Sequence, residues 1–147
     1  MKISTKGRYS LRMLIDLAMN CKEGEFVSLK EIAQRQNISK KYLEQIVTVL
    51  NKSHILQTNR GFQGGYKLAV APEKCTVGEI IRVTEGNLSP LACIDDDNEV
   101  RCDRSDECAT LFVWQGLKEV VTEYLDGITL QDIVDKKREG YANDYII

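Results

Sequence analysis

The sequence has few residues that interrupt helices and no long apolar segment. Its 147 residues include only two prolines, and no Ser/Gly-rich or repeated stretch indicates a long linker. No apolar run approaches the roughly 18 residues that a membrane-spanning helix needs. The N-terminal stretch MKISTKGRYS lacks the apolar segment of a secretory signal. We therefore expect a protein of the cytoplasm with no membrane contact. Structural disulfides are rare in that compartment.

The sequence also lacks the residue combinations that enzymes use. It has one histidine, His54, and no nucleophile motif. The glycine-rich stretch GFQGG follows a short predicted strand but opens no helix, so it does not fit a nucleotide-binding loop. His54 stands alone between two predicted elements and is interpreted as a turn residue. The sequence therefore predicts that the protein is not an enzyme.

The charges that are present are unevenly distributed along the chain. The net charge is −2, but residues 1–68 contain 12 Lys and Arg against 5 Asp and Glu, whereas residues 69–147 contain 8 against 17. A basic front half indicates a surface that faces a polyanion, which the nearly neutral total conceals.

Three helices are predicted in the basic half. Apolar residues at helical spacing predict the first helix over 9–20. Ser28 and Glu31 form a capping box that opens a short second helix, and Ser39 can cap the third. The second and third helices are joined by a turn of about three residues, which fits a helix-turn-helix.

A basic hairpin follows these helices. Two short strands are predicted over 55–58 and 66–70, around a tip with Gly61, Gly64 and Gly65. The order of helix, turn, helix and hairpin predicts a mainly α fold with a small β wing. We assign residues 1–75 to this winged helix-turn-helix DNA-binding domain.

Candidate DNA-binding residues follow from the docking of such domains, in which the start of the second helix of the motif meets the base edges. Arg60 at the wing tip can enter a narrow minor groove, where the potential is most negative. Lys and Gln can bond phosphate, guanine or adenine, and a carboxylate can accept from cytosine. The full candidate set is Lys6, Arg8, Ser39, Lys40, Lys41, Tyr42, Glu44, Gln45, Arg60 and Gly61.

The acidic half begins with a helix and a cysteine loop, which we assign to a connecting segment over 76–108. Thr76 and Glu79 form a second capping box for that helix. A long helix is then predicted from Ser105 to about Asp126, followed by a short last helix from Thr129. We assign residues 105–147 to a dimerisation segment.

The long helix has a wide apolar face. Its main stripe consists of Leu111, Trp114, Leu117, Val121 and Leu125, and Val113, Val120 and Tyr124 widen it. Such a face must be buried, either against a second copy of the chain or against the chain's own front half. A homodimer is the favoured interpretation.

The loop over 92–112 holds three cysteines, Cys93, Cys102 and Cys108, among seven acidic side chains. The loose spacing of the three thiols favours an iron–sulfur cluster over zinc, which usually uses tighter cysteine pairs. A thiol redox sensor without metal is an alternative. The other two cysteines, Cys21 and Cys75, lie in or beside apolar segments and are interpreted as buried small hydrophobic residues.

Several motifs together resemble one family. STKGRYSLRML, ISKKYLEQIV, NRGFQGGYKL, VGEIIRVTEG and the cysteine loop followed by LFVWQGLKEVV are similar to the IscR-type winged-helix regulators, which include CymR and NsrR, and most of all to their cluster-binding IscR branch. The resemblance implies a homodimer that crosses through the long helix and binds double-stranded DNA. It also implies a [2Fe–2S] cluster on Cys93, Cys102 and Cys108.

The fourth ligand of such a cluster departs from the pattern. Leu111 stands where the IscR pattern has a histidine, and Arg8 where the NsrR type has an aspartate. Other donors are near in sequence or could come from a partner subunit: Asp103, Asp106, Glu107, Thr110, Glu44 and His54.

Three functions are therefore compared. The first is a DNA-binding transcription regulator that senses iron–sulfur or redox status through the cysteine loop. The second is a CymR-like repressor without a cluster, which acts with an enzyme partner. The third, from another class, is a small redox or cluster-carrier protein.

Overall fold

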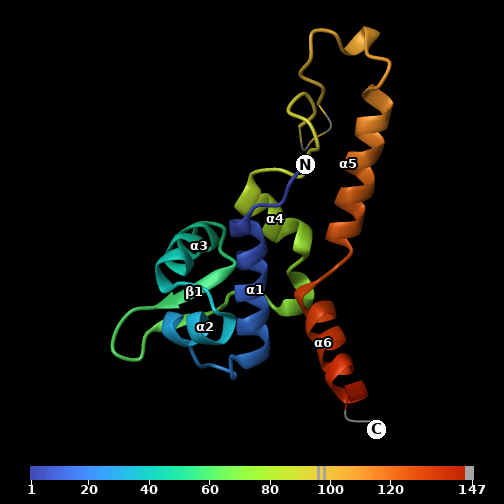
Figure 1. Cartoon of the computed structure of the whole chain (residues 1–147). Helices are drawn as coiled ribbons and strands as arrows, with labels where there is room; N and C mark the ends of the chain where they lie inside the picture. Colours follow the sequence, from blue (N-terminus) through green and yellow to red (C-terminus); the bar gives the residue numbers. More distant parts are fainter. Residues whose placement is uncertain (96, 98, 145–147) are drawn as a thin grey trace.

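Helices make up most of the structure, with one small sheet at the side. The computed structural model describes residues 1–95, 97 and 99–144, and of residues 143 and 144 only the backbone. Over these residues the chain forms six α-helices and a two-stranded antiparallel sheet. Helices α1 to α4 form the body, the wing loop extends from one side, and α5 with the cysteine loop rises away on the other (Figure 1). The predicted mainly α fold with a β wing is confirmed.

Helix α1, Thr5–Asn20, begins earlier than predicted because Ser4 caps it. The Ser4 hydroxyl accepts from the backbone N–H of Gly7 at 3.2 Å and donates to Glu85 Oε1 at 2.6 Å. The prediction that Lys6 and Arg8 precede the first helix is therefore wrong, since both lie in its first turns. The bond from Ser4 to Glu85 also ties the start of α1 to the end of α4, Val77–Glu85.

The helix-turn-helix consists of α2, Leu29–Gln36, and α3, Lys40–Lys52. Both halves of the predicted capping box are present, with Ser28 and Glu31 bonded to each other's backbone N–H. Asn37 ends α2 in the left-handed conformation, with φ of 52°, and Ile38 beside it is buried. The turn between the helices is therefore compact and anchored in the core.

The wing consists of β1, Leu56–Asn59, and β2, Gly65–Leu68. The register runs from Leu56 opposite Leu68 to Asn59 opposite Gly65. Tyr66 also exchanges backbone hydrogen bonds with Val27, at 2.8 and 2.9 Å. A Cβ on Gly65 would lie 2.5 Å from the Val27 carbonyl oxygen, so only glycine permits this close approach.

One core joins the two ends of the chain. The apolar faces of α1, α2 and α3 bury residues such as Met13, Ile32 and Ile46, and the same cluster includes Cys75 and Leu130. Leu130 opens α6, Leu130–Asp144, and its N–H donates to the Cys75 carbonyl at 2.9 Å. The prediction of a short last helix is therefore wrong. Helix α6 spans 15 residues and packs on α1.

Helix α5, Leu111–Asp126, begins later than predicted. Residues Ser105–Glu107 form a separate 3₁₀ turn, and Cys108 follows it with extended backbone angles, φ −80° and ψ 99°. An extended residue cannot continue a helix. Cys108 therefore lies before α5 and not, as predicted, in its first turn.

Candidate nucleic-acid interface

The start of α3 presents a polar face. Ser39 caps the helix by accepting from the backbone N–H of Tyr42 at 3.2 Å. The side chains of Lys40, Lys41, Glu44 and Gln45 are exposed. Four of the candidate DNA contacts are therefore accessible on one end of this helix.

Tyr42 has a different environment. Its ring is half-buried against the core and meets the ring of Tyr9 edge-on, with centroids 5.7 Å apart. The guanidinium groups of Arg8 and Arg12 lie 6.0 and 5.2 Å from the centroid of the Tyr9 ring. The tyrosine pair thus places two arginines of α1 beside the start of α3, while the half-buried Lys6 lies on the same helix.

A groove of about 660 Å³ separates α3 from the wing. Its lining includes the cations Lys30, Lys40 and Arg60 and one acid, Glu44. Gly61 lies at the same rim, where its φ of 131° favours glycine. The groove therefore brings Lys40 and Glu44 of the predicted helix together with Arg60 and Gly61 of the wing, whereas Lys41 and Gln45 are not in its lining.

Lys30 and Arg12 were not among the sequence candidates. Lys30 is exposed in the first turn of α2, only two residues after its N-cap. Arg12 follows Arg8 by one helical turn on α1. The spacing of Arg8 and Arg12 is a signal that the sequence contains, whereas nothing local to Lys30 indicates that it faces the wing.

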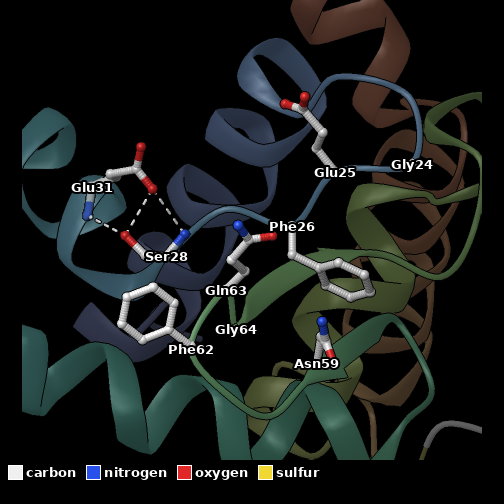
Figure 2. Close-up of a pocket in the computed structure, with 9 residues that line it drawn as sticks. All are labelled: Gly24, Glu25, Phe26, Ser28, Glu31, Asn59, Phe62, Gln63 and Gly64. Carbon is white, nitrogen blue, oxygen red and sulfur yellow. Dashed lines mark hydrogen bonds between the residues drawn. The ribbon is translucent and has the colours of Figure 1, made fainter.

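A second groove lies on the other side of the wing. It has a volume of about 550 Å³ and is lined by residues of the 24–31 segment and of the wing tip, including Glu25, Glu31 and Phe62. Figure 2 shows Glu31 held by Ser28. The hydrogen bonds from Ser28 lower the pKa of Glu31. This groove is therefore acidic, in contrast to the basic groove.

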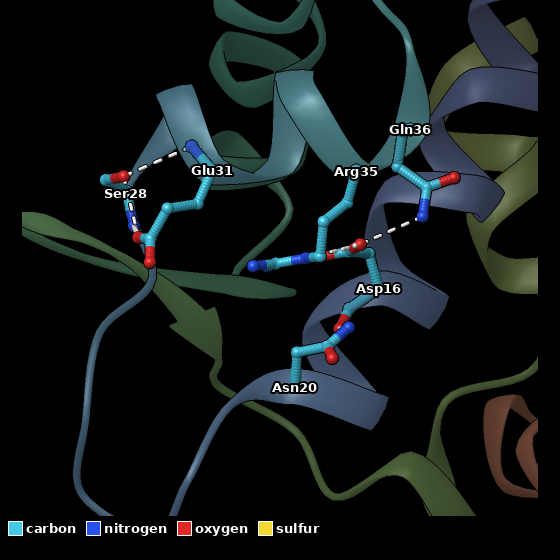
Figure 3. Close-up of polar contacts among 6 residues, drawn as sticks. All are labelled: Asp16, Asn20, Ser28, Glu31, Arg35 and Gln36. Carbon is cyan, nitrogen blue, oxygen red and sulfur yellow. Dashed lines mark hydrogen bonds and ion pairs between the residues drawn. The ribbon is translucent and has the colours of Figure 1, made fainter.

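An ion pair fixes α2 on α1 beneath this surface. The Asp16 side chain is 1% exposed and accepts from Arg35 at 2.7 to 3.2 Å and from Gln36 at 2.9 Å (Figure 3). The Asp16 hydrogen bond raises the pKa of Arg35. The pair sets how the helix-turn-helix stands on the first helix.

The cysteine loop begins as an irregular hairpin. Ile94 pairs with Val100, and the Arg101 N–H donates to the Cys93 carbonyl at 2.9 Å, which brings Cys93 opposite the residue before Cys102. Asp95 forms an ion pair with Arg101 at 2.9 Å. Asp96, one of the seven acidic residues of this loop, lies outside the described residues.

The three loop cysteines differ in their surroundings. Cys102 and Cys108 line one cavity of about 370 Å³ with Arg104 and Glu107, and Cys93, which is half-buried, is not in that lining. Cys108 is exposed, and a hydrogen bond with the Thr110 hydroxyl, at 3.6 Å, lowers its pKa. Soft thiolate donors suit an iron–sulfur cluster.

The donors of the loop are not gathered in this conformation. Within the described ranges, no group of three or more His, Cys, Asp or Glu lies close enough to hold a metal ion. A cluster on Cys93, Cys102 and Cys108 therefore fits the chemistry of the residues but requires the loop to close around it. The sequence placed the thiols in one loop, and the loop backbone decides how far apart they stand.

Cys21 and Cys75 belong to the body. Cys75 is buried, which raises its pKa to about 11, and this confirms the interpretation for that residue. Cys21 is only half-buried, because it ends α1 at the surface and its thiol donates to the Glu25 carbonyl at 2.9 Å.

Helix α5 divides its apolar residues between two faces. Leu111, Trp114, Val121 and Leu125 of the predicted stripe are half-buried, and Leu125 packs against α4. The exposed members are instead Phe112, Val113, Leu117, Val120 and Tyr124. The helix therefore packs on its own chain with one side and leaves a second apolar face open.

A lysine connects α5 to the cysteine loop. Lys118 is only 3% exposed, although it lies in the middle of this apolar helix. Its ammonium group donates to the backbone carbonyl of Asp95. The loop is thus attached to the helix two residues after Cys93.

Membrane insertion finds no support in the helices. In the part of the chain that the structure covers, none is both long and apolar enough to cross a bilayer.

Comparisons with known proteins agree with this architecture. A family model described as "Rrf2: Iron-dependent Transcriptional regulator" matches residues 3–136. The HTH-type transcriptional regulator CymR of Bacillus subtilis is 42% identical over 144 residues, which cover 96% of this chain and 97% of CymR. The HTH-type transcriptional regulator IscR of Aliivibrio salmonicida is 33% identical over 134 residues, covering 91% of this chain and 77% of IscR.

Two solved structures are similar over most of their length. CymR of B. subtilis, described as the global cysteine regulator, matches with a TM-score of 0.73 at 41% identity, covering 92% of this chain and 98% of that one. IscR of T. potens matches with a TM-score of 0.74, also at 41% identity, covering 95% and 90%. Equal identity to both structures does not assign the chain to one branch.

Proposed function

The chain belongs to the Rrf2 family of transcriptional regulators, and on this premise we propose that it works as a dimer that binds operator DNA through the α3–wing surface. Its relatives are regulators and not enzymes, as predicted. We also expect the protein to reside in the cytoplasm, where the DNA of a bacterium is accessible to it.

The basic groove is the observation that supports DNA binding. Lys30, Lys40 and Arg60 line it together, and neutralising phosphates with such cations supplies most non-specific affinity. Arg8 and Arg12 extend the positive surface beyond the start of α3. The described lining of the groove contains no residue of the acidic back half.

Each exposed residue of α3 has a proposed role. Lys40 and Lys41 contact phosphate or guanine, Gln45 contacts adenine, and Glu44 accepts from cytosine and so disfavours other bases. Arg60 enters the minor groove next to the half-site. The domain limits at residues 75 and 105 are proposed as the functional division between DNA binding, sensing and pairing.

Fluorescence anisotropy tests this proposal with a duplex selected on the protein from a random 40-bp library. Gln45→Ala should weaken binding to the selected duplex by roughly 10-fold and relax preference at one base pair. Lys41→Ala should weaken binding to all duplexes and reduce the salt slope by about 1. Binding with no dependence on salt would contradict the proposed surface. Glu73→Ala, an exposed change on the 3₁₀ turn Pro72–Lys74, serves as the control.

Dimerisation is proposed to occur through the open face of α5. Phe112 is 74% exposed there, and Val120 and Tyr124 lie on the same face. Pairing with a second copy would bury the open α5 face of each copy. It would also set the distance between the two α3 helices. Half-sites about 34–36 Å apart, or a multiple of that distance, match such a pair.

For sensing, we propose that Cys93, Cys102 and Cys108 hold an iron–sulfur cluster. When bound, the cluster would supply a redox-sensitive cationic centre. The protein's own part is to close the loop hairpin near Lys118, whose bond to Asp95 carries a change of loop shape to α5. An oxygen donor such as Asp103, Asp106, Glu107 or Thr110 would complete the ligands.

A CymR-like repressor without a cluster is the second candidate. Two observations favour it: the three thiols stand apart, and the chain is 42% identical to CymR. An enzyme partner would then carry the signal. A redox or cluster-carrier function is not retained, since the relatives are regulators.

A spectrum of protein purified without oxygen, with iron and sulfide analysis, separates the two candidates. Visible absorption and about two iron atoms per chain support the cluster. Colourless, iron-free protein that still discriminates its operator supports the CymR-like form. The triple change to Ser at positions 93, 102 and 108 should alter operator preference, and Cys21→Ser, at a half-buried thiol outside the loop, is the matched control.

A further inference from the structure

The tip of the wing carries a fully exposed aromatic ring. Phe62 has a relative exposure of 106%, the highest among the exposed large apolar residues of the described chain. Burying such a side chain is worth about 2 kcal/mol. An apolar ring with no packing partner in the described structure, at the end of a binding element, is the kind of residue that a ligand covers.

The backbone makes this tip narrow. Gly61 has φ of 131°, and the Gly64 N–H donates to the Gly61 carbonyl at 3.0 Å. A Cβ on Gly64 would lie 2.7 Å from the Asn59 carbonyl oxygen and 2.8 Å from that of Gly61, so the turn closes on itself without room for a side chain. Phe62 therefore stands on a thin, tightly bonded hairpin.

The charges around the tip select the occupant. On the α3 side the groove carries Lys30, Lys40 and Arg60, with Glu44 as its acid. On the other side Glu25 and Glu31 line the acidic groove, which Phe62 borders at the wing tip (Figure 2). A polyanion is attracted to the α3 side and repelled from the acidic side, so a duplex that lies on α3 meets the tip at the border between the two grooves, where the ring of Phe62 is fully exposed.

We propose that Phe62 is a wedge that inserts between two base pairs in the minor groove of the operator and bends the DNA. This inference rests on the proposed function. Arg60, two residues away, neutralises the phosphates of the same groove, while the ring of Phe62 partly unstacks one base step. Apolar wedges of this kind kink a duplex by 20–90° toward the major groove.

The wedge has a consequence for operator sequence. Unstacking costs least at pyrimidine–purine steps, which are flexible. The step under each wing should therefore be a TA or CA/TG step, selected by deformability and not by hydrogen bonds. The preference would lie outside the bases that α3 reads.

The experiment measures affinity and bend on the same operator, selected from the random 40-bp library; anisotropy gives the affinity, and gel mobility of circularly permuted fragments that carry the operator gives the bend. Phe62→Ala should bind roughly 10-fold more weakly, lose the bend and keep the salt slope. Phe62→Leu should retain the bend. Gln63→Ala, the matched change at the neighbouring exposed position, should match the wild type in both.

Two outcomes overturn the wedge: Phe62→Ala that keeps both affinity and bend, or Phe62→Ala that loses affinity while the bend persists. A wild-type protein that binds no duplex overturns the proposed function itself, and this result is distinct because it does not depend on Phe62. Circular dichroism melts test whether each variant is folded. We expect all of them to fold, because substitutions at an exposed hairpin tip change stability little.

Discussion

The front of the molecule, which consists of α1 to α3 and the wing, differs from the cysteine loop with α5 in how its helices are capped and packed. In the front, each helix start has its cap, at Ser4, Ser28 and Ser39, and the apolar faces meet in one core. In the back, α5 starts at Thr110 without a side-chain cap, and one of its faces lies open. The front is complete within one chain, whereas the back is shaped to be completed by something else.

This difference matches the division of labour that we propose. A surface that must fit DNA gains from a fixed geometry, such as the one that Asp16 and Arg35 give to α2. A segment that must report a signal gains from contacts that it can make or lose, such as the separate thiols and the open face of α5. Substitutions can test whether the two regions behave so differently.

The largest effect is expected from a charge on the open face of α5. Val120→Asp should convert dimers to folded monomers, because a buried carboxylate without a partner is strongly disfavoured. The loss of the second DNA-binding domain should weaken operator binding about 1,000-fold. Light scattering and anisotropy measure the two effects. Glu119→Lys changes a charge beside this face and should remain dimeric; a dimeric Val120→Asp would contradict the proposed interface.

The buried ion pair of the front comes next. Asp16→Asn should lower the free energy of unfolding by about 3 kcal/mol, at the low end for a broken buried pair because the Arg35 side chain is 36% exposed. Urea denaturation followed by circular dichroism measures it. Glu23→Gln removes the same charge at an exposed position and should change stability little. Equal effects of the two would show that the pair does not fix α2 on α1.

Helix caps provide a direct comparison between the regions. Ser28→Ala removes a complete capping box and should cost about 1 kcal/mol of unfolding free energy. Thr110→Ala should cost less than about 0.5 kcal/mol, because its hydroxyl does not cap α5 but accepts from Trp114 Nε1 at 3.2 Å. Thermal melts of the two variants measure the two losses of stability. A larger loss for Thr110→Ala than for Ser28→Ala would contradict the expected difference between the regions.

A small effect is also expected from the ion pair that joins the two regions. Arg82 pairs with Asp126 at 2.7 Å, and its hydrogen bonds lower the pKa of that carboxyl below its ordinary value. Because a lowered carboxyl pKa stabilises the fold only above the unfolded value, the contribution persists at neutral pH and is lost as the pH falls through the folded value.

Asp126→Asn should therefore reduce stability by less than about 1 kcal/mol at pH 7, since both side chains are about one-third exposed. Its difference from the wild type should stay constant from about pH 8 to 5 and shrink toward pH 3. Urea midpoints across this range measure it, with Glu123→Gln as control. A difference that grows in acid would contradict the assignment.

The features predicted best from the sequence are those with local causes. The capping box at Ser28 and Glu31 and the glycines of the wing act within a few residues, so they could be read directly. The predicted start of α5 was wrong because the acidic residues after Ser105 resemble the first turn of a helix. The extended backbone at Cys108, which separates this turn from α5, has no signal in the sequence.

Features that depend on distant partners could not be predicted. The pairing of Asp16 with Arg35 and the position of Lys30 opposite Arg60 arise only when helices from different parts of the chain pack. For the same reason the apolar stripe of α5 was identified, but not which of its residues would face the chain itself. The exposure of Phe62 also depends on the course of the whole hairpin.

The return of the chain at Leu130 limits how this protein can be divided. Because Leu130 fills the same core as Met13 and bonds to the Cys75 carbonyl, a gene fragment that stops at residue 75 would leave a hole in the hydrophobic interior. Residues 1–75 therefore do not complete their own hydrophobic core. A shortened protein that keeps the winged portion folded must also supply Leu130 and the start of α6.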